Sequence, residues 1–529
     1  DRQYIAPRVD NFDRGTIYFS EKDGTRVSAA TLKSGFTLAI NPSQITDISG
    51  TYEKLSSVVE IEKELFFFRA GKTDDPYEEI LKQLDEKQAE EIDSLDLDGV
   101  ILVRRNWRFY PAGNMASHVL GFVGYKGNVF SGQYGLERFH NDILERGEDE
   151  LFVNFFAEVF SNISKAIKND EKNNRKGNVI TSIEPSTQGV LEEELSKLQT
   201  KWNSEVAGGI IINPKNGEIY ALSSLPDFNP NEFNIVSDQA VFRNPLVQNV
   251  YEMGSIVKPL TMAIGLDTGM VSYDSTYDDK GYVLFGDAKI QNYDGRARGI
   301  ISMQEVLNQS LNTGAVHVMQ EVGKETFRDY LYKFEINEKT GIDLPHEASA
   351  LVSNLKGGRE IEYATASFGQ GFAVSPVAMV RALSVLANGG YLATPHTVKE
   401  IDYTLGFPET VEIKKGKQVL KPETSEEISR MLVEVVDTAL KNGEVKNERY
   451  SVAAKTGTAQ IANPDGSGYY DDRYLHSFFG YFPAYDPQFL VFLYTVNPKE
   501  VRYASETLTD PFINITKFLI NYYAIPPDR

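Results

Sequence analysis

The chain has 529 residues, of which 41% are hydrophobic, and this is enough to build roughly two to four domains with cores of their own. Its 75 acidic and 54 basic residues give a formal net charge of -21, which disfavours nucleic-acid binding because that function needs a basic face. The chain has no cysteine, so disulfides, zinc-thiolate sites and iron-sulfur clusters are excluded.

The first part of the chain, residues 1–165, has the pattern of a mainly-β domain. Polar and apolar residues alternate in several short runs, and Asp23-Gly24 is typical of a tight turn between two of them. One charged run, Pro76 to Leu95, repeats apolar residues at helical spacing and predicts a helix. Strands are expected at 14–19, 24–27, 36–40 and 99–103. No acid-base constellation stands out here, and we interpret the region as a non-catalytic platform.

A polar, charged segment from Lys165 to Lys176 predicts a solvated loop and a domain boundary. Beyond it, residues 178–529 have the pattern of a larger unit that mixes helices and strands. Two strand-forming runs flank Asn216-Gly217, a dipeptide typical of hairpin turns. We expect a sheet here, followed by a helix that begins near Ser255.

The most informative stretch is Ser255-Ile-Val-Lys258, at the start of an apolar run that closes at Thr268-Gly269. Residues three apart share one face of a helix, so we expect the Lys258 amine beside the Ser255 hydroxyl. A serine becomes a good nucleophile when a base removes its proton, and a lysine is such a base only when neutral. Lowering a lysine pKa from about 10.4 to roughly 7 requires burial and a neighbouring cation. The pattern therefore predicts a recessed site with a second positive group.

Ser-x-x-Lys is a short pattern, so a single match is weak evidence. The chain holds a second copy, Ser353-Asn-Leu-Lys356, which continues directly into Gly357-Gly358. Glycine disfavours the helix that would keep this pair in register, and we interpret the second copy as a loop.

Ser310-Leu-Asn312 lies between two runs of helical periodicity. Its hydroxyl and its amide can face one cleft, where the serine would relay a proton and the amide would orient a ligand carbonyl. From the local pattern alone, a helix-capping role for Ser310 and Asn312 is the stronger interpretation.

Lys-Thr-Gly also occurs twice. Lys339-Thr-Gly341 lies in a loop-like segment that leads to Pro345, whereas Lys455-Thr-Gly457 continues a run of strand-forming residues and precedes a hairpin. On a strand, the glycine lets a substrate backbone pair alongside. The second copy is therefore the one that we associate with binding.

The strand that carries Lys455 completes the predicted site. Lys455 would supply the second cation, and the hydroxyls of Thr456 and Thr458 would bind a carboxylate. The backbone N–H groups of Ser255 and Thr458 would polarise the carbonyl under attack, as an oxyanion hole does.

In this order, Ser255-x-x-Lys258, Ser310-x-Asn312 and Lys455-Thr-Gly457 resemble the motif set of penicillin-binding proteins and serine β-lactamases. The flanking segments point to the class B, monofunctional penicillin-binding proteins, and the resemblance covers nearly the whole chain. Thr181–Gln188, Gly208–Asn213 and Pro226–Pro230 resemble the start of the transpeptidase domain, and Arg14-Gly15 and Gly135–Glu137 its N-terminal pedestal, or dimerisation, domain. Met253, where relatives usually have proline, and Leu311 depart from the pattern but remove no reacting group.

The resemblance implies an α+β, multidomain fold. Residues 178–529 would form the penicillin-binding domain, with a five-stranded antiparallel sheet flanked by helices, and residues 1–165 an elongated, mainly-β pedestal. It also implies an N-terminal membrane anchor and a place on the extracytoplasmic face of the cell membrane. The sequence begins at Asp1, without methionine, signal peptide or long apolar run, so we expect a soluble fragment whose preceding segment has been removed.

The activity implied is that of a serine-type D-Ala-D-Ala transpeptidase that cross-links peptidoglycan stem peptides. Ser255, deprotonated by Lys258, would attack the D-Ala-D-Ala amide and expel the terminal D-alanine, and an amine of a neighbouring stem would accept the acyl group. Ser310 and Lys455 are candidates for passing protons, and β-lactam antibiotics would acylate the same serine. No metal or organic cofactor is expected, because a hydroxyl, two amines and an oxyanion hole suffice.

The end of the domain, with Phe479–Pro483 and Asp510-Pro-Phe512, looks more like the septal, cell-division branch than the elongation branch. This branch implies a membrane glycosyltransferase and division proteins as partners. A β-lactamase or a β-lactam sensor would share the three motifs but would not explain the platform, and a non-catalytic scaffold is the remaining alternative. The six histidines lack metal-ligand spacing, and neither a Gly-x-Ser-x-Gly nor a His-Glu-x-x-His motif occurs.

Overall fold

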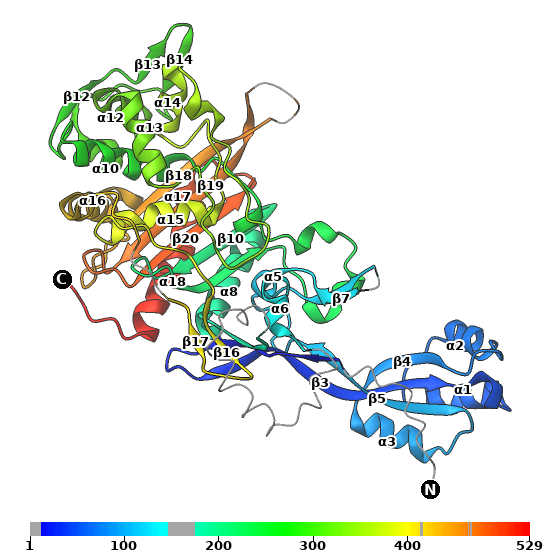
Figure 1. Cartoon of the computed structure of the whole chain (residues 1–529). Helices are drawn as coiled ribbons and strands as arrows, with labels where there is room; N and C mark the ends of the chain where they lie inside the picture. Colours follow the sequence, from blue (N-terminus) through cyan, green and yellow to red (C-terminus); the bar gives the residue numbers. More distant parts are fainter. Residues whose placement is uncertain (1–11, 128, 147–174, 413–415, 464, 466–467) are drawn as a thin grey trace.

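A computed structural model describes residues 12–127, 129–146, 175–412, 416–463, 465 and 468–529. A large body carries most of the helices, and an elongated arm ends in a small head (Figure 1). The predicted loop 165–176 lies outside the described residues except for Arg175 and Lys176. No described helix combines the length and the apolarity needed to cross a bilayer.

The large body is built on a five-stranded antiparallel sheet, as predicted, and the order of its strands is β11-β10-β20-β19-β18. The β10-β11 hairpin turns at Asn216-Gly217, and Gly217 has a positive φ of 84°. Because β18 is the last strand in this order, one of its edges has no strand partner among the described residues. The strands are β10 (Val206–Ile212), β11 (Ile219–Leu225), β18 (Ala453–Ala462), β19 (Tyr469–Phe482) and β20 (Phe489–Val496).

Helices cover both faces of this sheet (Figure 1). On one face α8 (Pro185–Trp202) and α18 (Thr509–Tyr522) share an apolar core with the strands. On the other face lie α10 (Lys258–Thr268), α15 (Pro376–Ala387) and α16 (Pro422–Glu434). Every residue of α15 is buried, which makes it the central helix of this layer.

A further group of short elements lies beyond α10, next to the free edge of β18. It contains two hairpin-like pairs, β12 with β15 and β13 with β14, and four helices. The elements are β12 (Thr276–Asp279), β13 (Tyr282–Phe285), β14 (Ala288–Gln291), β15 (Gly299–Ser302), α11 (Met303–Asn308), α12 (Asn312–Val322), α13 (Lys324–Lys333) and α14 (Glu360–Ala366).

The arm is a seven-stranded sheet with the order β17-β16-β9-β2-β3-β4, in which β5 also pairs with β3. Two of its strands, β16 and β17, come from the part of the chain that forms the large body. The strands are β2 (Ile17–Ser20), β3 (Arg26–Ile40), β4 (Glu78–Leu84), β5 (Val100–Phe109), β9 (Gly177–Thr181), β16 (Val398–Tyr403) and β17 (Glu409–Thr410).

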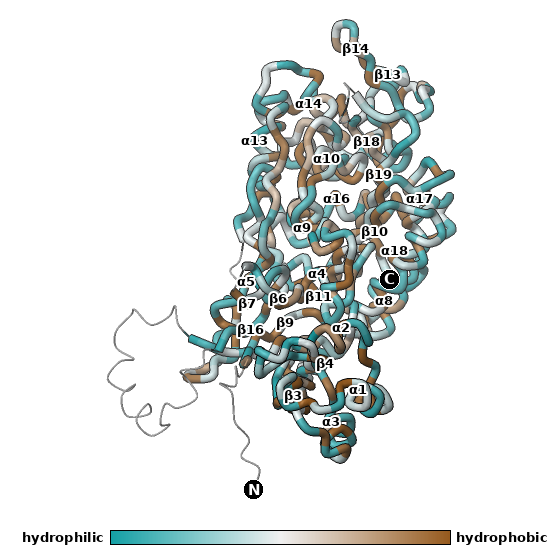
Figure 2. The backbone as a smooth tube through the Cα atoms, turned by 90° about the vertical axis from the view of Figure 1, so that its right-hand side faces the viewer, coloured by the Kyte–Doolittle hydropathy of each residue, from teal (hydrophilic) through white to brown (hydrophobic). Residues whose placement is uncertain are grey.

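Three helices form the head on the far ends of β3, β4 and β5, with an apolar core of their own. They are α1 (Ile48–Ser56), α2 (Lys63–Ala70) and α3 (Glu86–Ser94). Figure 2 shows this head at the opposite end of the molecule from β18 and α10.

The helix predicted from Pro76 to Leu95 is wrong in its first half. Leu81 and Leu84 of β4 pair with β3, so a contact distant in sequence overrides the local periodicity. The helix begins only after Asp85, which forms a reciprocal capping box with Gln88. The strand predicted at 24–27 begins only at Arg26, and it continues without a break into the one predicted at 36–40 as the single 15-residue strand β3.

A buried ion cluster ties together three segments of the pedestal. The Glu137 carboxylate, fully buried, accepts hydrogen bonds of 2.6 Å from both Arg14 and Arg108. Burial alone would raise the pKa of Glu137, but the two guanidinium groups lower it. Both guanidinium groups also donate to backbone carbonyls, Arg14 to that of Glu137 and Arg108 to that of Gly15, so the cluster has a structural role, which agrees with a platform.

Candidate active site

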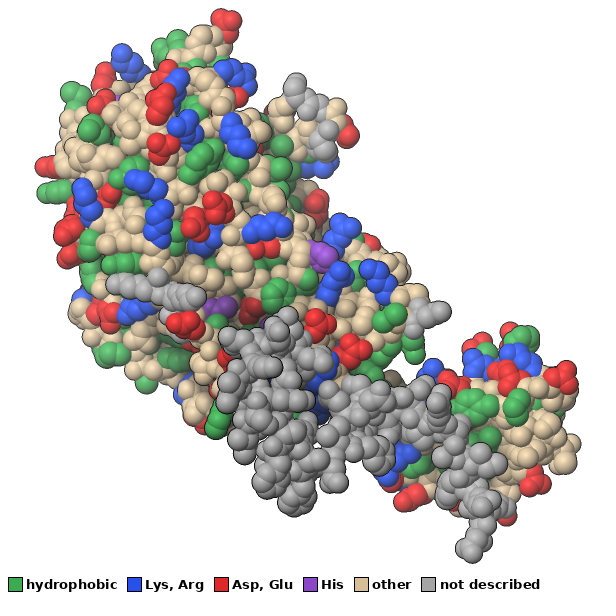
Figure 3. All heavy atoms as spheres, in the orientation of Figure 1, with side chains coloured by type: hydrophobic (Ala, Val, Ile, Leu, Met, Phe, Trp, Pro, Cys, Tyr) green, Lys and Arg blue, Asp and Glu red, His purple; other side chains and the backbone are tan. Residues whose placement is uncertain are grey.

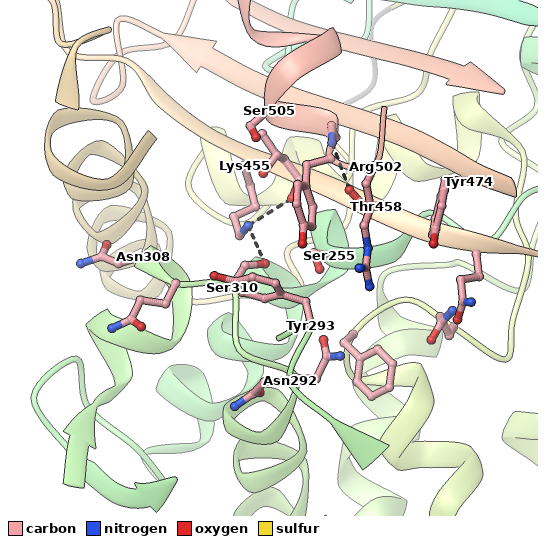
Figure 4. A pocket seen from close by; sticks show the side chains of 18 of the residues that line it. Ser255, Asn292, Tyr293, Asn308, Ser310, Lys455, Thr458, Tyr474, Arg502 and Ser505 are labelled. Atoms are coloured by element: carbon pink, nitrogen blue, oxygen red, sulfur yellow. Dashed lines mark hydrogen bonds between the residues drawn. The ribbon is translucent and has the colours of Figure 1, made fainter. Parts of the chain in front are cut away.

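A cleft of about 790 Å³ lies along the β18 edge, between the sheet and the elements around α12 (Figure 4). The three motifs, distant in sequence, meet here. Six of the predicted site residues line the cleft: Ser255, Ser310, Asn312, Lys455, Thr456 and Thr458. Phe368 and Gln370 line it as well.

Ser255 lies on a single 3-10 turn, Gly254–Val257, that continues directly into α10. Two glycines allow this turn to lie against β18. A Cβ atom on Gly254 would come within 2.8 Å of the Thr458 carbonyl oxygen, and one on Gly457 within 2.9 Å of the Ile256 nitrogen. The glycine of Lys-Thr-Gly is therefore required by the turn that carries Ser255, a reason that the sequence alone did not reveal.

Two lysines converge on Ser310 beneath the cleft. The Lys258 amine donates to the Ser310 carbonyl at 2.5 Å and lies 3.3 Å from its hydroxyl, and the Lys455 amine donates to the same hydroxyl at 2.9 Å. In the part of the chain that the structure describes, Lys258 makes no hydrogen bond to Ser255. The pairing expected between these two residues is thus replaced by a Lys258-Ser310-Lys455 cluster, because Ser310 offers two oxygens to the buried amine.

Both amines are withdrawn from water, Lys258 being 1% and Lys455 3% exposed. Burial lowers the pKa of Lys258 well below its usual range, and the charge of Lys455 lowers it further. Burial also lowers the pKa of Lys455, to about 7. The amine is recessed and has a second amine close by, as expected, and its role as a base stays a prediction.

The loop that presents Ser310 is held in an uncommon conformation. Ser310 has a φ of +55°, in the left-handed region that residues other than glycine rarely adopt. The next residue, Leu311, donates its N–H to the Val306 carbonyl, which closes α11. Asn312 is the first residue of α12, and its side-chain amide donates to the Gln291 carbonyl at 2.9 Å. The capping role that the local pattern favoured for Ser310 and Asn312 is therefore wrong.

A distant pair of side chains caps α12 instead. The Asn292 side-chain oxygen accepts from the Thr313 N–H at 3.2 Å, and Asp279 accepts from the Thr313 hydroxyl at 2.8 Å. Asp279 is 1% exposed and also accepts from the Asn292 amide and the Gly281 N–H. This network fixes the start of α12, next to Ser310, to the inserted strands.

Several residues that line the cleft carry no sequence motif. Tyr293 and Tyr503 come from opposite walls, with ring centroids 5.9 Å apart and edge to face. Arg502 and Tyr474 line the sheet side, and Figure 4 shows both beside Thr458. The segment with Arg502 is tied to the site because the Ala504 N–H, at the start of α17 (Ala504–Thr507), donates to the Thr458 hydroxyl at 3.1 Å.

Lysines, hydroxyls and amides dominate this cleft, and they suit acyl transfer. Among the described residues, no group of three or more His, Cys, Asp or Glu side chains could hold a metal ion. The arrangement offers a nucleophile, two amines of lowered pKa and the edge of a strand for a peptide ligand.

Comparison with known proteins decides the family. Residues 207–516 match the model of the penicillin-binding protein transpeptidase domain, and residues 10–182 match the penicillin-binding protein dimerisation domain. The chain belongs to the class B penicillin-binding proteins. With its transpeptidase domain it is an enzyme, an acyltransferase of the serine type, which confirms the family and the fold predicted from the sequence.

Relatives support this assignment over the full length. Stage V sporulation protein D of Bacillus subtilis is 32% identical over 530 residues, covering 98% of this chain and 79% of the relative. Probable peptidoglycan D,D-transpeptidase PenA of Neisseria meningitidis is 26% identical over 541 residues, covering 100% of this chain and 88% of the relative.

Solved structures share the fold of this penicillin-binding protein. Penicillin-binding protein 2X from Streptococcus thermophilus superposes with a TM-score of 0.77 at 19% identity, covering 97% of this chain and 80% of that one. Penicillin-binding protein 3 from Mycobacterium tuberculosis, in complex with aztreonam, superposes with a TM-score of 0.73 at 20% identity, covering 98% of both chains.

Proposed function

We propose that this class B penicillin-binding protein is a peptidoglycan D,D-transpeptidase in which Ser255 carries the acyl group. The observation that supports this most strongly is the buried Lys258-Ser310-Lys455 cluster at the floor of a cleft that Ser255 lines. A lysine of lowered pKa can be neutral near neutral pH, and a neutral lysine can take the proton of a serine.

The proposed reaction has two halves. The Ser255 oxygen forms an ester with the penultimate D-alanine carbonyl of a stem peptide, the C–N bond breaks, and the terminal D-alanine leaves with the proton that Ser255 lost. An amine of a neighbouring stem then attacks the ester, gives up a proton, and frees Ser255. Lys258 takes the first proton, and Ser310 and Lys455 pass protons between the two halves.

The other predicted residues bind and orient the peptide. The peptide pairs with the free edge of β18, and Thr456, Thr458 and Lys455 hold its terminal carboxylate. The backbone N–H groups of Ser255 and Thr458 stabilise the oxyanion, and the Asn312 amide orients the peptide. β-Lactams acylate Ser255 in place of the peptide.

The first test is the intact mass of the protein after incubation with benzylpenicillin, for the unmodified chain and for Ser255→Ala. One stable adduct that is missing in Ser255→Ala supports the proposal, and an adduct that persists in Ser255→Ala contradicts it. Rapid loss of the adduct would favour a β-lactamase. D-Alanine release from an acyl-D-Ala-D-Ala peptide, measured with an amine acceptor present, then distinguishes a transpeptidase from a β-lactam sensor.

For the cellular role, we propose septal cell-wall synthesis on the extracytoplasmic face of the membrane, with a membrane glycosyltransferase and division proteins as partners. Support comes from the sequence pattern of Phe479–Pro483 and Asp510–Phe512. The pedestal, proposed as residues 1–165, would set the transpeptidase domain, 178–529, at a distance from the membrane.

Sporulation is the second candidate role, favoured by the 32% identity to stage V sporulation protein D. Depletion of the protein in the organism that encodes it separates the two. Filamentous cells without septa indicate division, whereas normal growth with defective spores indicates sporulation.

A further inference from the structure

The cleft has a charge opposite to that of the chain as a whole. Its described lining includes four basic side chains and no Asp or Glu, although the chain carries 75 acidic residues. The four are Lys289, Lys441, Lys455 and Arg502. On the face seen in Figure 3, by contrast, acidic and basic side chains are interspersed. A cleft whose charged lining residues are all basic attracts anionic ligands.

Two of these four cations, Lys455 and Lys441, have polar partners, and of the other two only Arg502 presents a planar fork beside Thr458. Lys455 donates to Ser310, Lys441 forms an ion pair with Asp510, and the Lys289 ammonium lies 4.6 Å from the centre of the Tyr282 ring. The Arg502 side chain has neither a carboxylate nor a carbonyl partner within the described ranges. Its guanidinium lies 5.6 Å from the Tyr503 ring centre, a contact that leaves its N–H groups free.

Although the Arg502 side chain is exposed, partly buried hydrogen bonds hold the backbone that carries it. Its carbonyl accepts from His476, whose ring is fully buried and whose pKa burial lowers to about 4. The neutral ring therefore keeps this bond at neutral pH. The Ala504 N–H donates to the Thr458 hydroxyl, so the proton of that hydroxyl remains available for an anion. Thr458 and Arg502 together form a donor-rich end of the cleft on a backbone that these bonds hold in place.

We propose that Arg502 is an anion subsite that binds a second carboxylate of the acyl-donor peptide, in addition to the C-terminal one. This inference rests on the proposed function of Ser255. An arginine fork binds a carboxylate through two parallel hydrogen bonds, and the absence of acidic neighbours in the cleft strengthens that pairing. The enzyme therefore prefers a donor with an acidic side chain over one whose side chain is amidated.

Two β-lactams that differ by one carboxylate test the subsite. Carbenicillin is benzylpenicillin with an added carboxylate on its side chain, and the ratio of their second-order acylation rate constants isolates that group. In Arg502→Gln, the carbenicillin-to-benzylpenicillin ratio should fall about tenfold, the loss of one charge-assisted contact. Arg502→Lys should recover part of the ratio, since it restores the charge without the fork.

A matched control is Arg473→Gln. Arg473 is an exposed arginine of β19 whose guanidinium lies 4.2 Å from the Tyr470 ring centre, and it does not line the cleft. Its removal should leave the ratio unchanged. An equal fall in Arg473→Gln would mean that overall charge, and not the subsite, sets the preference, and would overturn the proposal.

Peptides test the same subsite without a β-lactam. With Ser255→Ala, which cannot be acylated, the affinity for acetyl-Glu-D-Ala-D-Ala should exceed that for acetyl-Gln-D-Ala-D-Ala, and Arg502→Gln in this background should remove the difference. Equal affinities would overturn the subsite. Failure of benzylpenicillin to acylate the unmodified chain would instead contradict the proposed function, so the two failures are distinguishable.

Discussion

Ser255-x-x-Lys258 and Ser353-x-x-Lys356 share a spacing but have opposite surroundings. Lys258 is buried beneath the cleft and next to a second cation, whereas Ser353 and Lys356 are exposed on one 3-10 turn that ends at Gly357. The loop predicted for the second copy is thus a single turn of helix. The second copy therefore lacks the buried amine and the neighbouring cation that distinguish the first.

The two Lys-Thr-Gly copies differ in the same way. Lys455-Thr-Gly457 lies on the edge strand of the sheet, while Lys339-Thr-Gly341 lies in a loop whose groups are used structurally: the Thr340 N–H donates to Glu347, and the Lys339 carbonyl accepts from Arg381. Both comparisons show that burial, a neighbouring cation and a strand edge decide whether a short motif can do chemistry.

The largest effect is expected from the serines. Ser255→Ala should abolish the penicilloyl adduct, because the nucleophilic oxygen is gone, and Ser353→Ala should leave its yield unchanged. Intact mass measured on both variants under the same conditions checks this. An adduct lost in Ser353→Ala would show that the comparison is wrong.

The next largest effect is expected from the lysines of the two Ser-x-x-Lys copies, Lys258 and Lys356. Lys258→Ala removes the proposed base and should slow acylation by roughly 10²- to 10⁴-fold, the usual range for general bases. Lys356→Ala should have no effect on the rate, since its amine is in solvent. Stopped-flow acylation with a fluorescent penicillin measures both. Equal rates for Lys258→Ala and the unmodified chain would assign the base to another group.

The third prediction concerns pH and the two Lys-Thr-Gly copies. Acylation should fall in acid as Lys258 gains a proton, and it should fall again above about pH 7 as Lys455, whose pKa is about 7, loses the charge that holds the carboxylate. In Lys455→Arg the alkaline fall should disappear, because arginine keeps its charge. The acid fall should move to lower pH, because the permanent charge depresses the pKa of Lys258 further.

Lys339→Arg is the control for this pH profile. Its side chain is outside the cleft, so both limbs should stay where they are in the unmodified chain. An alkaline limb that persists in Lys455→Arg would mean that another group titrates there.

The parts of the site that the sequence predicted correctly are those that depend on residues close together in the chain. The hairpin at Asn216-Gly217, the helix after Ser255 and the strand of Lys455 depend on near neighbours in the chain, and all three are confirmed. Arg502 escaped prediction because its position depends on His476 and Thr458, which other strands bring close. The helix prediction over β4 was wrong for the same reason, since the pairing of β4 with β3 depends on residues distant in the chain.

The smallest effect is expected from Asp279, which touches no substrate and acts through the loop of Ser310. Asp279→Asn keeps the size of the side chain but replaces one acceptor oxygen by a donor, so the contacts with Asn292 and Thr313 conflict. The start of α12 should loosen, and acylation should slow by about tenfold, the rate equivalent of one weakened hydrogen-bond network.

A positioning role for Asp279 differs from a general loss of stability. Since Lys258 owes part of its surroundings to the Ser310 loop, the acid limb of the pH profile should shift to higher pH in Asp279→Asn as water reaches the amine. The control is Asp278→Asn, the exposed neighbour on β12, which should change neither the rate nor the profile. A lower melting temperature with an unchanged rate and profile would mean that Asp279 only stabilises the fold.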